Sequence, residues 1–152
     1  MKSFEDLEVF QEAIALMVEV YRLTEAFPRH ELYGLTSQVR RSAGSVVAHI
    51  AEAEGRLTPG ERRQLLSQGR GSLFETSAHL IAAHEIGYLD DECFAAIRKR
   101  TQSVGRLLSG FIRYVKRLEA QAHMFRRPKS PNYQSPTTSN QQTNAATPPT
   151  PR

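Results

Sequence analysis

Basic residues in the second half of the chain have types and spacing that suit contact with phosphate groups. From Arg98 to Arg117 the sequence carries several lysines and arginines and no aspartate or glutamate. A spacing near seven residues places part of them along one stripe of a helix, and such a stripe can neutralise phosphates and release counterions. The candidate nucleic-acid-binding residues are Arg40, Arg41, Arg62, Arg63, Arg70, Lys99, Arg106, Arg113, Lys116, Arg117, Arg126 and Arg127.

The arrangement of this charge matters more than its total. The net charge is +4, but residues 1–119 carry equal numbers of basic and acidic residues, so the excess comes from residues 120–152. A second interpretation of the basic stripe therefore stays open. It is a solvated outer face whose arginines pair with acids of neighbouring helices, and the acids of the first helix are the candidates: Glu8, Glu12, Glu19 and Glu25.

Other chemistry finds little support in the sequence. A ferritin-like metal site needs Glu-x-x-His, and no histidine of this chain has glutamate three residues before it, so we expect no metal site. The lone Cys93 falls in the first turn of a predicted helix, where the dipole favours a thiolate, but Asp90, Asp91 and Glu92 oppose this. We predict no catalytic residue, no cofactor and no enzymatic activity.

The elements that position these residues are four predicted helices with short connectors. The first spans about Phe4–Ala26 and carries two apolar stripes, one through Ile14 and one through Leu16; the second spans about Leu35–Glu54. The third begins at the capping box Thr58-Pro59-Gly60-Glu61 and ends before Gly87, with a stripe of Leu65, Leu73 and Leu80. Glycines within the third helix predict the close approach of a neighbouring backbone.

The fourth predicted helix has the most regular apolar pattern. It starts after Asp90 or Asp91 and reaches at least Leu118, with apolar positions from Phe94 onward alternating by three and four residues. The prediction is an all-α fold, an antiparallel up-down-up-down four-helix bundle over residues 1–119. Residues 120–152 are expected to form a basic junction and a disordered tail, because residues 128–152 are dominated by Pro, Ser, Thr, Asn and Gln.

The sequence resembles the four-helix-bundle proteins first noticed in intervening sequences of bacterial large-subunit rRNA genes, a family with a ribosomal-protein label. The motifs that carry the resemblance run from Phe4 to about Leu118, and include Val20-Tyr21-Arg22-Leu23-Thr24, Glu31-Leu32-Tyr33-Gly34-Leu35-Thr36-Ser37-Gln38-Val39-Arg40-Arg41-Ser42-Ala43 and Ile50-Ala51-Glu52. The resemblance implies a homo-oligomer, commonly a pentamer. It also implies a relation to the accessory variability determinant of diversity-generating retroelements, a basic pentameric barrel that associates with a reverse transcriptase and RNA.

Two hypotheses for function follow. The first is a non-enzymatic homo-oligomer that binds RNA or DNA through basic helix surfaces, as an accessory to a nucleic-acid enzyme such as a reverse transcriptase. The second is an oligomeric protein-interaction scaffold that does not bind nucleic acid. No signal peptide or membrane-length apolar run is present, since the longest apolar run is Ala13–Val18, so we expect a cytoplasmic protein that does not contact a membrane.

Overall fold

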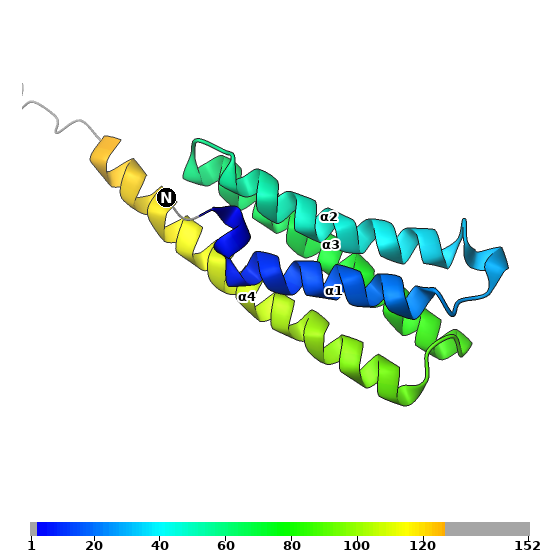
Figure 1. Ribbon diagram of the computed structural model, residues 1–152. Helices are drawn as coiled ribbons and strands as arrows, with labels where there is room; N and C mark the ends of the chain where they lie inside the picture. Colours follow the sequence, from blue (N-terminus) through cyan, green and yellow to red (C-terminus); the bar gives the residue numbers. More distant parts are fainter. Residues whose placement is uncertain (1–2, 127–152) are drawn as a thin grey trace, which may run out of the picture.

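A computed structural model describes residues 3–126, and it confirms the predicted all-α four-helix bundle. The helices are α1 (Glu8–Thr24), α2 (Leu35–Glu54), α3 (Pro59–Ile86) and α4 (Asp91–Arg126). Each packs against the next along the chain, and α4 closes the bundle against α1 (Figure 1). The last turns of α4 extend beyond the other helices and pass residue 119, the predicted end of the bundle (Figure 1). The predicted disordered tail falls outside the described residues from 127 onward.

The start of the first predicted helix is wrong, because a separate 3-10 turn precedes α1. This turn, η1 (Phe4–Asp6), is closed by a capping box in which the backbone N–H of Ser3 donates to the Asp6 carboxylate at 3.0 Å. Leu7 then adopts an extended conformation, which breaks the helical path before Glu8. The end of α1 also comes earlier than predicted, at Thr24.

Capping residues fix both ends of α3 where the sequence placed them. The hydroxyl of Thr58 accepts from the N–H of Glu61 at 3.3 Å, and Gly87 follows α3 with a φ of 91°, a conformation that glycine adopts at little cost. The second short 3-10 turn, η2 (Arg29–Glu31), leads into α2. Glu31 accepts from the N–H of Leu35 at 2.9 Å and from the Tyr88 hydroxyl at 3.1 Å, and these bonds lower the pKa of its carboxyl.

The core is built from one stripe of each helix. On α1 the stripe through Leu16 is buried, whereas the stripe through Ile14 is only partly covered. On α3 the prediction of Leu65 as a core residue is wrong: Leu66 is buried, in register with Leu73 and Leu80, and Leu65 is half-buried. The largest fully buried side chains come from all four helices: Leu16, Ile50, Leu66, Ile97 and Leu108. None of the helices in the described part of the chain is long and apolar enough to cross a membrane.

Helices α2 and α3 form the most extensive helix pair, and Gly69 lies at a close contact between them. A Cβ atom at Gly69 would lie 3.2 Å from the Cβ of His49, whereas a Cβ at Gly71 would meet no atom within 4 Å. The predicted backbone approach is therefore confirmed at Gly69 and not at Gly71. About two turns further along, the buried Thr76 hydroxyl donates to the Ser42 hydroxyl at 2.9 Å, which satisfies two polar groups across the same helix pair.

Charged side chains join α1 to α4. Arg100 donates to the carboxylates of Glu19 at 2.6 Å and Glu12 at 3.2 Å. Two of the four acids named in the alternative interpretation therefore do face α4, and both pair with Arg100, which is not among the candidate nucleic-acid-binding residues.

The two α3 glycines give a matched test of the helix packing. Gly71→Ala is expected to raise the free energy of unfolding by about 1 kcal/mol, because an exposed glycine inside a helix costs that much relative to alanine. Gly69→Ala gains the same helix propensity but forces a methyl group against His49, at a cost of about 1–3 kcal/mol for overpacking. Urea unfolding followed by far-UV circular dichroism measures both. Equal stabilisation by the two substitutions would contradict the close approach of α2 and α3.

Candidate nucleic-acid interface

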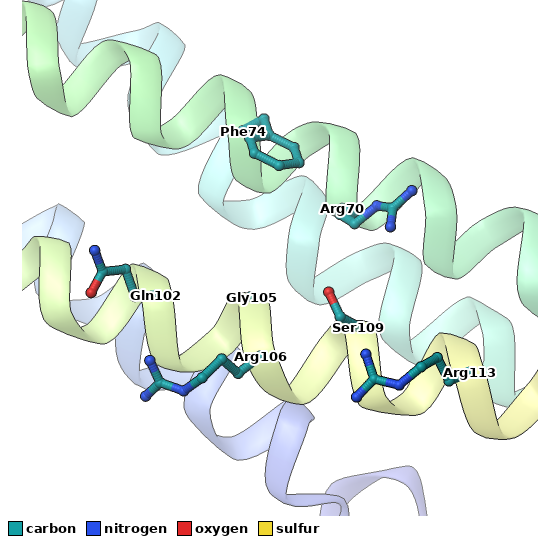
Figure 2. A pocket seen from close by; sticks show the side chains of 7 residues that line it. All are labelled: Arg70, Phe74, Gln102, Gly105, Arg106, Ser109 and Arg113. Atoms are coloured by element: carbon teal, nitrogen blue, oxygen red, sulfur yellow. The ribbon is translucent and has the colours of Figure 1, made fainter.

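A groove of about 580 Å³ lies on the outer side of the α3–α4 pair, and three arginines line it. Arg70 and Phe74 come from α3, and the α4 side is formed by Gln102, Gly105, Arg106, Ser109 and Arg113. Figure 2 shows Phe74 and Arg70 on α3 across from the α4 residues, with Arg106 and Arg113 two turns apart on α4. Seven residues of helix separate these two by about 10 Å along the axis.

Helix periodicity and residue size together create the groove. Arg70 and Phe74 are four residues apart and so share one face of α3, and the α4 lining residues recur at intervals of three or four. Gly105 and Ser109 lie between the larger side chains of α4, so no bulky side chain fills the space there. The inner side of Gly105 is closed by Leu73, since a Cβ at Gly105 would lie 3.5 Å from its Cδ2 atom. The hollow therefore opens outward from the core.

The groove concentrates uncompensated positive charge. Arg70, Arg106 and Arg113 are exposed, and no acidic residue is among the described residues that line the groove. Within residues 3–126, none of the three guanidinium groups forms an ion pair. They are thus available to an external anion, and arginine suits phosphate because its planar guanidinium donates two parallel hydrogen bonds.

Three other candidate arginines are held by contacts within the bundle. Arg40 donates to the Thr24 hydroxyl at 2.8 Å and stacks 4.6 Å from the centre of the Tyr21 ring. Arg62 pairs with Glu54, and Arg63 donates to Glu119 at 2.7 Å. This hydrogen bond lowers the pKa of the Glu119 carboxyl and raises the pKa of Arg63. These side chains tie neighbouring segments together.

The remaining candidates lie on other surfaces. Those that are exposed but do not belong to the groove lining are Arg41, Lys99, Lys116 and Arg117. Arg126 is the last residue of α4, but its side chain is outside the described part of the structure, as is the whole of Arg127. The predicted set of basic residues therefore separates into a groove, a group of internal pairs and scattered surface positions.

Sequence reasoning missed the aromatic and polar members of the groove. Phe74 is 70% exposed, an unusual position for a large apolar side chain, and Gln102 and Ser109 supply hydrogen-bonding groups. The sequence places Phe74 four residues after Arg70, on the same side of a helix, and two residues before the buried Thr76. This spacing identifies Phe74 as an outward-facing residue only once the inward-facing side of α3 is known.

The structure offers no comparable basis for metal or thiol chemistry. No group of three or more His, Cys, Asp or Glu side chains within the described residues is placed to hold a metal ion. Asp90 accepts from the backbone N–H of Cys93 at 2.7 Å, and a hydrogen bond to the same carboxylate raises the pKa of the Cys93 thiol. Asp90 and Glu92 thus oppose formation of a thiolate at Cys93, as the sequence indicated.

Residues 5–110, well over half of the chain, match the family described as 23S rRNA-intervening sequence protein. The chain belongs to this family. The matched residues cover α1 to α3 and most of α4, including all of the groove except Arg113.

A solved structure supports the fold of this 23S rRNA-intervening sequence protein family member. It is a protein with unknown function from the S23 ribosomal protein family of Bacteroides thetaiotaomicron VPI-5482, with a TM-score of 0.65 and 21% sequence identity. The similarity covers 69% of this chain and 95% of the other. Neither the matched family nor this structure is described as an enzyme. No curated protein sequence matches the chain.

The Arg63–Glu119 pair predicts acid sensitivity. Because the pKa of Glu119 is lowered in the folded state from its ordinary value of 4.5, the unfolded chain takes up this proton at a higher pH than the folded chain. The stabilisation is complete above pH 4.5 and is lost as the pH falls below it. Glu119→Gln should therefore reduce the loss of urea-unfolding free energy between pH 7 and pH 3. The exposed Glu25→Gln is the control, and an equal effect of both substitutions would contradict the prediction.

Proposed function

We propose that this protein binds RNA or DNA through the groove between α3 and α4. The observation that carries the proposal is the convergence of Arg70, Arg106 and Arg113 on one groove whose described lining contains no acid. Binding of a phosphate backbone by such a surface is driven by the release of counterions and needs no catalytic group. The name of the matched family, which refers to 23S rRNA, is consistent with an RNA partner.

Charge reversal of the groove tests this proposal directly. The triple variant Arg70→Glu, Arg106→Glu and Arg113→Glu is expected to weaken RNA binding by at least about tenfold, because three phosphate contacts are replaced by repulsion. For the unaltered protein, the logarithm of the binding constant should fall with log salt at a slope of about −2, given about 0.7 per phosphate contact on a single strand. Fluorescence anisotropy of labelled RNA across a salt series measures both quantities.

A matched control separates the groove from the total charge. Arg22, Arg29 and Arg41 are exposed and lie outside the groove lining, so reversing them to Glu changes the net charge by the same amount. RNA affinity should fall much less in this control than in the groove variant. Equal losses in the two triple variants would mean that only net charge matters, and unchanged affinity in the groove variant would refute the proposal.

We also propose that the protein self-associates, with the pentamer implied by the family resemblance as the leading arrangement. Support comes from a partly exposed apolar face on α1, where positions three, four and seven residues apart share one side of the helix. These residues are Ile14, Met17, Val18 and Tyr21, of which Val18 is 38% and Tyr21 46% exposed. Association would bring several copies of the groove together and multiply a modest affinity for a long polyanion.

A charge placed on this α1 face tests self-association. Val18→Glu is expected to shift the molar mass measured by light scattering toward that of one chain, because burying a carboxylate without a partner is costly. The helical circular dichroism should stay unchanged, since Val18 is not a core residue. Ala95→Glu adds the same charge at an exposed position of α4 and is the control. A mass that Val18→Glu leaves unaltered would exclude this face as the interface.

The wider role that we propose is that of a non-enzymatic accessory, without cofactor, to an enzyme acting on nucleic acid. A retroelement reverse transcriptase is the example that the family resemblance suggests. The support from the structure is the groove, whose lining offers guanidinium, aromatic and amide groups for binding. Co-purification of a reverse transcriptase with the unaltered protein, and not with the groove variant, is the outcome expected for this role.

One observation favours the alternative, an oligomeric protein-interaction scaffold. Several arginines form ion pairs with acids of other helices, including Arg62 with Glu54 and Arg100 with Glu12 and Glu19. Some of the basic residues therefore hold helices of the bundle together. A scaffold would form the same oligomer but would bind RNA weakly, with a flat salt dependence. The salt series described above distinguishes the two functions.

A further inference from the structure

A second hollow continues the groove along the same helix pair and gives it an apolar half. This hollow has a volume of about 210 Å³, and half of its lining residues are aromatic or aliphatic: Phe74, Leu80, Ile81 and Phe94. Phe74 and Gln102 line both spaces, so the two hollows adjoin each other. Because α3 and α4 are antiparallel, Arg70, Arg106 and Arg113 lie toward one end of the combined groove, and the apolar side chains lie toward the other end together with Arg98.

Phe74 stands at the junction of the two halves with its ring open to solvent. At 70% exposure it contributes little to the core, and it lies beside Arg70 on the same face of α3. On the apolar side, Ile81 is 49% exposed, and the Arg98 guanidinium lies 5.9 Å from the centre of the Phe94 ring. An exposed aromatic ring next to several guanidinium groups matches the requirements of a nucleobase and its phosphate.

We infer that the groove takes single-stranded nucleic acid, with the phosphates at Arg70, Arg106 and Arg113 and an unpaired base stacked on Phe74. This inference rests on the proposed function and adds the strandedness of the substrate. In a duplex the bases are already paired and stacked on one another, so only the phosphates reach a surface of this kind. A single strand offers the phosphates and the faces of its bases, so it alone engages both halves of the groove.

Gln102 lies where the two halves meet and complements this arrangement. It projects from α4 across from Phe74 (Figure 2), and its amide carries both donors and an acceptor for the edge of a base. An acidic peptide would satisfy the arginines, but it would leave the exposed ring of Phe74 and the apolar hollow without a matching group. The apolar half therefore favours a nucleobase over a carboxylate-rich partner.

The absence of tryptophan from the sequence makes Phe74 directly testable. In the full-length Phe74→Trp variant, the single indole reports on the groove. Titration with a single-stranded RNA oligonucleotide should quench or shift its fluorescence, whereas a duplex of the same sequence should leave the signal nearly unchanged. A Tyr33→Trp variant, which places an indole on the exposed connector before α2, is the control and should not respond to either RNA.

Affinities of substituted proteins separate stacking from simple apolar contact. Phe74→Ala should weaken single-strand binding by about 5- to 150-fold, the range for loss of one stacked base, and leave duplex binding within about twofold. Phe74→Tyr should retain single-strand affinity. Phe74→Leu, which keeps an apolar side chain without a ring face, should lose most of it. The exposed Phe74 makes these variants compatible with folding, which circular dichroism checks.

The outcomes distinguish failure of this inference from failure of the proposed function. If the arginine reversal weakens all RNA binding but Phe74→Ala weakens none, or weakens single strand and duplex equally, the inference is overturned and the proposed function stands. If the arginine reversal leaves the affinity for every RNA unchanged, the proposed function and this inference are both overturned. If poly-glutamate displaces the single-stranded RNA at equal phosphate and carboxylate concentrations, the groove is a site for acidic peptides, and the inference is overturned.

Discussion

The close approach of α3 to α2 determines where the outer residues of α3 point. Gly69 lies against His49, and the buried hydroxyls of Ser42 and Thr76 meet about two turns away, so rotation of α3 about its axis would separate both contacts. With that face held inward, helix geometry directs Arg70 and Phe74 toward the rim that α3 shares with α4. A small residue and a buried hydrogen bond thus set the position of the groove, although neither lines it.

Ion pairs within the bundle determine which basic residues remain available to bind another molecule. The body of the protein has balanced charge, and four of its acids pair with Arg62, Arg63 and Arg100. These pairs are partly exposed and contribute little stability each. Their main consequence is spatial, because none of these four acids lines the groove, and Arg70, Arg106 and Arg113 form no ion pair within residues 3–126. The surface potential is therefore local, even though the folded body is close to neutral.

The sequence was sufficient for the fold because the signals were local. The Thr58–Glu61 capping box, the Gly87 stop and the apolar seam of α4 each depend on residues a few positions apart, and the structure has them as predicted. Two details required tertiary information. The burial of Leu66 in place of Leu65 depends on the rotation of α3, and the choice between the two stripes of α1 depends on which neighbours flank it. The set of residues that line the groove also depends on tertiary packing. The sequence alone does not say which basic residues have an acidic partner on another helix.

The chemical make-up of the groove lining determines to which solution conditions its charge responds. Among the described residues that line it there is no histidine, aspartate or glutamate, and arginine stays protonated wherever the protein is folded. The site also lies along the middle of two antiparallel helices, whose macrodipoles oppose each other there. Its field therefore comes from fixed side-chain charges alone. Such a groove is insensitive to acidification over the physiological range and is governed by ionic strength, so counterion concentration is the physical variable to which it responds.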